Sequence, residues 1–234
     1  MLHLDDLAQF LEHFLAVHRF SQAERGGVYL PSTRPISKLG LALEPWSQLA
    51  QWADHHRLDA LFLHRPWKLQ PEQLPQNLGV VSYHLAFDER LTLGFNPRLA
   101  DVLAMSTLSV LGKKEGRPIG MIGQIPTQNF SSYCSCVNEV FDGHDEAHIG
   151  VRTEISQVAV VGAMTDTLVR EAVERGADVY ITGQFRKSAS STVSETGIGI
   201  IAVGHHRCEE WGLRAIAGVL RERWSRLEVV LPPS

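Results

Sequence analysis

The most constraining feature of this sequence is a series of short apolar runs, each followed by a glycine or a histidine. Three such runs lie at 157–161, 178–182 and 198–203, directly before Gly162, Gly183 and Gly204. Runs of five or six residues rich in Val and Ile have the length of buried strands, and a helical pattern begins soon after each. Strands that alternate with helices over short connections predict an α/β fold with parallel strands.

The first half of the chain has the same organisation. An amphipathic helix is expected at 4–18, where Leu and Phe recur at helical spacing. Strands are expected at 26–31, where a turn closes a short strand, and at 37–43, 58–63 and 79–83. Pro45 is placed to open a helix that ends near His56, because proline is favoured in the first helical turn. This order predicts a βαβ unit.

The remaining elements extend this pattern to the C-terminus. Helices are expected at 97–103, at 165–175 with Thr165 or Asp166 as cap and Gly176 as stop, at 186–196, and after His205; strands are expected at 108–111, 118–125, 130–136 and 227–231. We therefore expect a first α/β lobe at 1–125, on which C-terminal elements pack back. An irregular connecting region follows at 126–150, and a second α/β segment at 151–234.

Composition excludes several classes of protein. The 234 residues carry a net charge of −4, which gives no electrostatic case for binding nucleic acid. No apolar run approaches the roughly 18 residues that a membrane span needs. The N-terminus lacks the basic region of a signal peptide. Three cysteines, an odd number, fit a reducing compartment, so we expect a cytoplasmic protein.

Histidines and carboxylates collect where expected strands end. They are His64, then His84 with Asp88 four residues on, then His205 and His206 with Glu209 four residues after His205. The i,i+4 spacing places His205 and Glu209 on one face of the expected helix, and functional groups of α/β sheets gather beyond the carboxyl ends of strands. Imidazole with carboxylate suits Zn, Mn, Fe or Co. The alternative is structural: hydrogen-bonded core histidines, and glutamates that favour the helix dipole.

A second polar group lies in the connecting region, where Asp142, His144, Asp145, Glu146 and His148 stand close together. It is either a further metal site or an exposed loop with a charge cluster. Loops seldom hold ligands to the tolerance that a metal site needs, which favours the exposed loop.

Other chemistries have weaker support. The segment 162–166 lacks the later glycines of a dinucleotide loop and the lysine of a P-loop. No Gly-x-Ser-x-Gly elbow is present. Cys208 is either a nucleophile or a small buried thiol, and the Cys134-x-Cys136 pair alone is weak support for zinc.

Four stretches together resemble the GTP cyclohydrolase 1 type 2 homologs, the NIF-three-like dinuclear-metal proteins. The stretches are 61–66, 84–88, 158–183 and 204–212. The resemblance implies an α/β, NIF-three-like fold of two related lobes with mixed sheets and a metal site between the lobes. It also implies a toroidal homohexamer. By position it implies His64, Asp88, His205 and Glu209 as metal ligands, with Glu209 bridging. His84 and His206 are then supporting or alternative ligands.

Two departures from the family pattern bear on the site. Arg65 stands where the family has the second His of a pair, and a guanidinium offers no lone pair to a metal. Gln184–Lys187 is basic where the family usually has an acidic residue. Arg65 and Arg186 are therefore candidates for binding a phosphate or carboxylate.

Two functions are expected from these residues. The first is a metal-dependent hydrolase that uses one or two divalent ions (Zn, Mn, Fe or Co) and acts on a nucleotide-like or other anionic small molecule. The second is a non-enzymatic, ring-shaped binding or regulatory protein with a structural or degenerate metal site. Neither reading includes a nucleic-acid or membrane partner.

Overall fold

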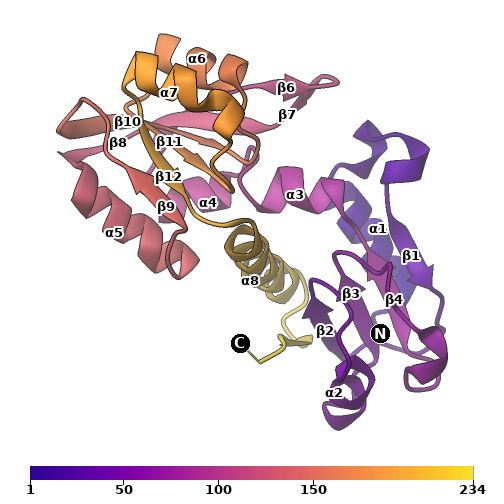
Figure 1. Cartoon of the computed structure of the whole chain (residues 1–234). Coiled ribbons are helices and arrows are strands. Elements are labelled where there is room, and N and C mark those ends of the chain that lie inside the picture. Colours follow the sequence, from indigo (N-terminus) through magenta and orange to yellow (C-terminus); the bar gives the residue numbers. More distant parts are fainter. Residues whose placement is uncertain (234) are drawn as a thin grey trace. The chain divides into compact units, whose positions relative to one another are not determined.

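The apolar runs form the strands of two separate sheets in the computed structural model, which describes residues 1–233. The chain divides into two units (Figure 1). Unit 1 comprises residues 1–87 and the residues from Leu213 on, and unit 2 comprises Asp88–Gly212. Both divisions fall inside helices, in α3 (Leu85–Leu91) and in α8 (His205–Arg223).

Unit 1 is built on a five-stranded mixed sheet of order β1-β4-β3-β2-β13. The strands are β1 (Gly27–Leu30), β2 (Lys38–Ala42), β3 (Ala60–Leu63), β4 (Gly79–Ser82) and β13 (Glu228–Val230). Only β1 runs antiparallel to its neighbour among these described strands. The expected strands of this half are confirmed, because β3 and β4 are buried on both faces as parallel strands require.

Helices cover the sheet of unit 1. They are α1 (Leu4–Phe14) and α2 (Leu49–His55), with short 3₁₀ turns at Val17–Arg19, Gln22–Glu24 and Pro71–Gln73. The α2 helix packs Leu49 and Trp52 on Leu61 and Val80 of the sheet. It begins four residues after Pro45, so the expectation that Pro45 opens this helix was wrong.

Unit 2 is built on a six-stranded mixed sheet of order β5-β8-β10-β11-β12-β9. The strands are β5 (Ser106–Val110), β8 (Gly120–Asn129), β9 (Glu146–His148), β10 (Glu154–Val161), β11 (Val179–Thr182) and β12 (Gly199–Ala202). The central β10, β11 and β12 are parallel, whereas β8 and β9 run antiparallel to them. A separate hairpin pairs β6 (Lys113–Lys114) with β7 (Arg117–Pro118).

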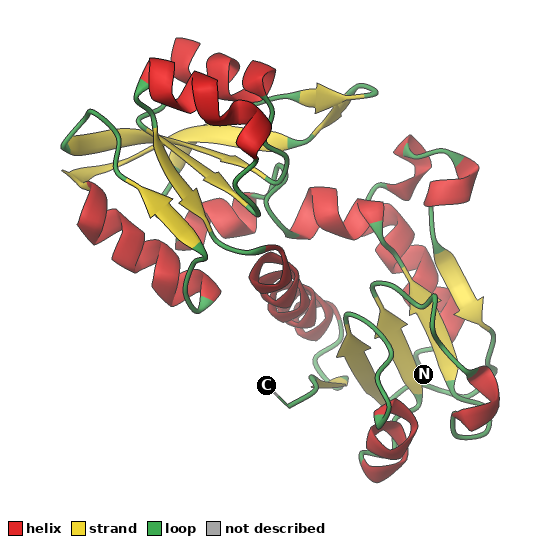
Figure 2. Cartoon of the chain, viewed as in Figure 1, coloured by secondary structure: helices red, strands yellow, loops and turns green. Residues whose placement is uncertain are grey.

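Helices lie on both faces of the unit 2 sheet, with α6 and α7 on one face and α5 on the other (Figure 2). The helices are α4 (Pro97–Val102), α5 (Phe130–Phe141), α6 (Asp166–Glu174) and α7 (Ser190–Thr196), with a 3₁₀ turn at Lys187–Ala189. The core under α6 joins Leu168 and Val169 to Ala159 and Tyr180 of the sheet. Thr165, not Asp166, is the cap of α6: its hydroxyl accepts from Leu168 N at 3.3 Å.

The segment 126–150, expected to be irregular, is regular in the structure. It holds the end of β8, all of α5, and β9. The strand expected at 130–136 is part of the α5 helix. Asn129 caps that helix by accepting from Ser132 N at 2.8 Å, and the buried Tyr133, Val137 and Phe141 follow at i,i+4 spacing. The period along this segment is therefore 3.6 residues rather than 2.

The two units share one order of elements although no repeat is visible in the sequence. In unit 1 the order is α1, β1, β2, α2, β3, β4, α3, and in unit 2 it is α5, β9, β10, α6, β11, α7, β12, α8; the α7 helix stands where unit 1 has only the 3₁₀ turn Pro71–Gln73. In each of these series the first strand pairs antiparallel with the fourth, and the second, third and fourth strands run parallel to one another. Equivalent positions in the two units can therefore be compared directly.

In each unit a buried aspartate accepts hydrogen bonds from backbone N–H groups where two parallel strands begin. Asp59, before β3, accepts from Ser37 N and Lys38 N, both at 2.9 Å. Asp178, before β11, accepts from Ser156 N at 2.7 Å and Gln157 N at 3.0 Å. An arginine also pairs with each carboxylate. Each aspartate therefore satisfies backbone donors that would otherwise lack a partner where two strands begin side by side.

No helix among residues 1–233 has both the length and the apolar character that crossing a bilayer requires.

Candidate metal centre

His64 lies directly after β3, and its imidazole is fully buried. Its Nδ1 is 3.2 Å from the carbonyl oxygen of Tyr83. A carbonyl oxygen only accepts, so Nδ1 must carry the proton and donate it. In a neutral imidazole Nε2 then holds the lone pair, which is the arrangement found in metal-binding histidines.

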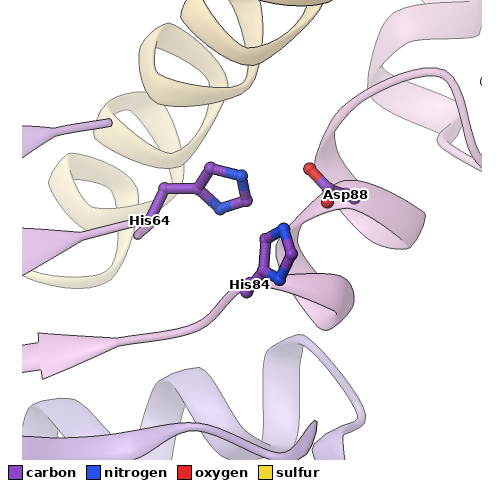
Figure 3. A group of neighbouring side chains, drawn as sticks. All are labelled: His64, His84 and Asp88. Atoms are coloured by element: carbon purple, nitrogen blue, oxygen red, sulfur yellow. The ribbon is translucent and has the colours of Figure 1, made fainter. Parts of the chain in front are cut away.

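His84 lies directly before α3, and Asp88 lies in the first turn of that helix. Figure 3 shows their side chains turned toward the imidazole of His64. Each of the three residues offers one ligand atom, and these atoms lie within 4.8 Å of one another. Two imidazoles and a carboxylate form a set suited to Zn, Mn, Fe or Co. His84 and Asp88 are only four residues apart, since α3 begins directly after His84.

Aromatic side chains surround the two imidazoles. The His64 ring centroid is 4.9 Å from that of His84 and 4.7 Å from that of Phe87. The Trp67 ring meets the ring of His84 edge-on at 5.1 Å, although the Trp67 side chain is itself 68% exposed. Such an apolar shell restricts rotation of the imidazoles and limits the access of water to the ligand atoms.

A second His–acid pair occupies the start of α8 in unit 2. His205 Nε2 lies 2.9 Å from Glu209 Oε1, and the two side chains are 71% and 1% exposed. His205 and Glu209 correspond to His84 and Asp88, since α8 is the equivalent of α3. The pair lines a cavity of about 210 Å³ whose lining also includes Asp88. The structure therefore brings together, within unit 2, three of the residues expected as ligands.

Glycines follow the parallel strands at this cavity. Gly162 follows β10 and Gly183 follows β11, and both line the cavity. Gly183 occupies the position that His64 holds in unit 1, directly after the second parallel strand. Unit 2 thus presents open space where unit 1 presents an imidazole.

Cys208 also lines the cavity but is a buried thiol. Its Sγ donates to Gly204 O at 3.0 Å, within the first turn of α8. Burial, and next the charge of Glu209, raise the pKa of the Cys208 thiol well above its usual range. A thiol that stays protonated is a poor nucleophile, so the structure favours the buried-thiol interpretation.

The other expected residues lie elsewhere. Arg65 Nε donates to Glu44 Oε1 at 2.7 Å, so its positive charge faces a carboxylate. Arg186 is exposed, at the start of the 3₁₀ turn before α7. His206 Nε2 is 3.3 Å from Glu210 Oε1, and its side chain is 72% exposed.

The polar group of 142–148 forms surface pairs in the described structure. Asp145 Oδ1 accepts from Arg207 at 2.6 Å, and Glu146 lies 3.0 Å from His148 on β9. His144 Nδ1 lies 2.5 Å from Asn138 Oδ1 of α5. Among residues 1–233, the potential metal ligands that lie close together are His64, His84 and Asp88, and none of the residues at 142–148 is among them.

The β6–β7 hairpin is the part of this region that the sequence reasoning missed. Arg117 of β7 is buried and donates through Nε to both carboxylate oxygens of Glu89, at 3.0 and 3.2 Å. Glu89 follows Asp88 in α3, and Lys114 of β6 lines the cavity. The signal in the sequence was weak: Gly116 suits a turn, but Glu115 is not one of the residues that two-residue hairpin turns favour before glycine.

Comparison with known proteins gives a consistent result. A sequence model of the Duf34/NIF3 (NGG1p interacting factor 3) family matches residues 2–232. A Deinococcus radiodurans protein named GTP cyclohydrolase 1 type 2 homolog is 21% identical over 94% of this chain and 89% of its own length. These matches confirm the resemblance inferred from the four sequence stretches.

Two solved structures have the same fold. The protein ybgI superposes with a TM-score of 0.79 at 19% identity, covering 100% of this chain and 99% of its own. A protein from Thermus thermophilus superposes with a TM-score of 0.77 at 21% identity, covering 100% and 99%. The expected α/β fold with mixed sheets is therefore confirmed.

Proposed function

The chain belongs to the Duf34/NIF3 family, and from this premise we propose that it is a metal-dependent hydrolase acting on a small anionic molecule. His64, His84 and Asp88 would hold its divalent ion. The observation that carries the proposal is the Nδ1 contact of His64 with the Tyr83 carbonyl, which leaves Nε2 as the ligand atom. The relatives named GTP cyclohydrolase 1 type 2 homolog make a nucleotide-like substrate the first to test.

The residues of the site have different roles in the proposed reaction. His64 and His84 would hold the ion through imidazole nitrogens, and the Asp88 carboxylate would offset part of its charge. When bound, a divalent ion supplies a Lewis acid that polarises a substrate oxygen or lowers the pKa of water. His205 and Glu209, with Asp88 in the lining of the cavity, are further ligand groups facing the substrate.

Metal binding is tested by titrating Zn²⁺, Mn²⁺ and Co²⁺ into metal-free protein by calorimetry. We expect His64→Gln to weaken binding about 100-fold, because it removes a fixed imidazole ligand. His148→Gln is the matched control, since His148 is exposed and pairs with Glu146 on β9. Equal affinity in wild type and His64→Gln would remove the metal site from the proposal.

Hydrolysis is tested separately on the metal-loaded protein, with GTP and phosphate monoesters as substrates. We expect turnover to require the ion and to fall in Asp88→Asn with little change in fold. A loaded protein that turns over neither class of compound would contradict the hydrolase assignment while leaving metal binding in place.

One observation favours a second function, a non-enzymatic ring-shaped binding protein with a degenerate metal site. Arg65 stands where the family has a second His, and its guanidinium is held by Glu44. In that case Glu209→Ala would disturb self-assembly, and there would be no turnover to lose. Sedimentation velocity with parallel activity assays separates the two. An intact homohexamer with lost turnover supports the enzyme, whereas a disturbed assembly with no turnover to lose supports the binding protein.

A further inference from the structure

Resting on the proposed function, we propose that Lys114 binds the anionic group of the substrate in the unit 2 cavity. In the same cavity, Gly162 and Gly183 leave room for the substrate's apolar body. The ligand class is a small phosphate or carboxylate ester or acid with a compact apolar group. Each residue in this argument lies between 88 and 212, inside unit 2.

The hairpin fixes the position of Lys114. Lys114 pairs with Arg117 across a two-residue turn, Glu115-Gly116. Both turn residues have left-handed φ values, 51° and 77°, as a tight type I′ turn requires. Lys113 lies next to Lys114 on the same strand, but it does not line the cavity. Side chains alternate along a strand, so the hairpin presents only one of the two lysines to the cavity.

The hairpin is itself fixed to the helix that carries Asp88. Arg117 is 3% exposed, and its guanidinium binds Glu89 through Nε and Glu115 through a terminal nitrogen at 2.8 Å. Its pKa is displaced upward, because the two carboxylates outweigh the opposing effect of burial. The buried ion pair therefore ties the Lys114 strand to α3, one residue from a proposed metal ligand.

The charge in the cavity makes Lys114 necessary for an anion. Asp88, Glu89 and Glu209 all line it, and Lys114 is the one lysine or arginine among the described residues of the lining. Arg117 already offsets Glu89. An anionic substrate approaching Asp88 and Glu209 would be repelled unless the bound ion and Lys114 supply the opposite charge.

The cavity wall has room for an apolar group. A Cβ added at Gly162 would come no nearer than 3.8 Å to Leu93, and one added at Gly183 no nearer than 3.8 Å to Cys208. Neither glycine has the left-handed φ that would demand glycine. The fold therefore tolerates side chains at both positions, and their absence leaves space beside Leu93 and Ile119. A compact apolar body fits this wall.

The experiment measures binding of methyl phosphate and phenyl phosphate by calorimetry, on zinc-loaded, desalted protein and on metal-free protein. Lys114→Met is expected to weaken both probes about tenfold or more, because it removes the ammonium from a cavity rich in carboxylates. Lys114→Arg is expected to restore most of that affinity. Lys113→Met, the matched control on the same hairpin, is expected to bind like wild type.

Gly183→Ala tests whether the space beside the glycines receives the apolar group of the ligand. The added methyl group should weaken phenyl phosphate about tenfold and change methyl phosphate about twofold or less, because only the larger ester reaches the wall. Circular dichroism and zinc content are measured on every variant, so that loss of fold or of metal is recognised.

The outcomes separate this inference from the proposed function. Three results would overturn the role of Lys114. The first is that Lys114→Met binds the probes as tightly as wild type, and the second is that Lys113→Met loses as much affinity as Lys114→Met. The third is that the wild type binds neither probe. Equal losses for both probes in Gly183→Ala would overturn the role of the glycines. Wild type that holds no zinc would remove the metal-dependent function, while Lys114-dependent binding by the metal-free protein would still support the anion site.

Discussion

Asp59 should contribute a large share of the stability of unit 1, and this share should depend on pH. Its Oδ2 accepts from Ser37 N, Ser37 Oγ and Lys38 N at 2.7–2.9 Å, and its Oδ1 lies 2.8 Å from Arg34 Nε. Asp59→Asn keeps the shape but removes the charge. Each backbone hydrogen bond then becomes a neutral one, a loss of about 1 kcal/mol. With the half-exposed Arg34 pair adding about 0.5 kcal/mol, the expected loss is about 2–3 kcal/mol.

The sign of the pH dependence follows from the pKa of Asp59. Burial alone would raise this pKa, but hydrogen bonds from Ser37 and Lys38 and the charge of Arg34 hold it below its usual range. A carboxyl whose pKa is lower in the folded state stabilises the fold above its unfolded pKa of about 3.9. That contribution is lost as the pH falls through the folded pKa. The variant and the wild type should therefore converge in acid.

Urea unfolding followed by circular dichroism at pH 7 and pH 3 is the assay. We expect the free energy of unfolding of Asp59→Asn to lie about 2–3 kcal/mol below that of the wild type at pH 7, and this gap to narrow at pH 3. Asp178→Asn is the matched comparison, because Asp178 accepts from Ser156 N and Gln157 N in unit 2. A gap under about 0.5 kcal/mol at pH 7 would refute the hydrogen-bond reasoning. A gap that is the same size at pH 3 would refute the charge reasoning.

Three further predictions concern single positions. Arg65→His, which replaces the guanidinium held by Glu44, should raise the metal content from about one to about two ions per chain by elemental analysis; an unchanged content would exclude Arg65 as the missing ligand position. Asn129→Ala should cost about 1 kcal/mol in urea unfolding, because it removes the cap on Ser132 N, whereas Asn129→Ser should retain most of it. Gly40→Ala should cost about 1–3 kcal/mol in thermal unfolding, since its Cβ would lie 2.5 Å from Leu58 Cδ1; a neutral result would mean that the neighbouring side chains yield.

The parallel strands were predictable because their signal is local. Runs such as Val158–Val161 and Val179–Thr182 are continuous, apolar and of strand length, which is how a strand buried on both faces reads in sequence. The glycine or histidine after each run then marks the carboxyl end of a strand, where functional groups collect. His64 was found in this way, and the structure places it directly after β3.

The misplaced elements depend on contacts that a single sequence does not display. The segment 130–136 contains Phe130 and Tyr133, which favour strands, yet it is helical because its apolar residues pack as one helical face. The α3 helix begins directly after His84 and was not recognised, since it is only seven residues long. Short helices owe their stability to packing rather than to propensity.

The types of residue in the candidate site were predictable from the sequence, but which of those residues lie together was not. The i,i+4 spacing placed Asp88 with His84 and Glu209 with His205, and the structure retains both pairs. That His84 joins His64 depends on β3 and β4 being neighbours in the sheet. The role of the hairpin rests on Arg117 reaching Glu89, a contact between residues 28 positions apart that no local pattern encodes.

The position of β13 has a consequence for how this protein is made. The strand at 228–230 pairs with β2 and completes the sheet of unit 1, although more than a hundred residues of unit 2 intervene in the chain. While the ribosome synthesises those residues, β2 is an edge strand with backbone donors and acceptors open to other chains. A nascent or truncated chain that stops before residue 228 therefore exposes the backbone groups of β2 that β13 otherwise pairs, and such a chain should aggregate more readily than one that includes β13.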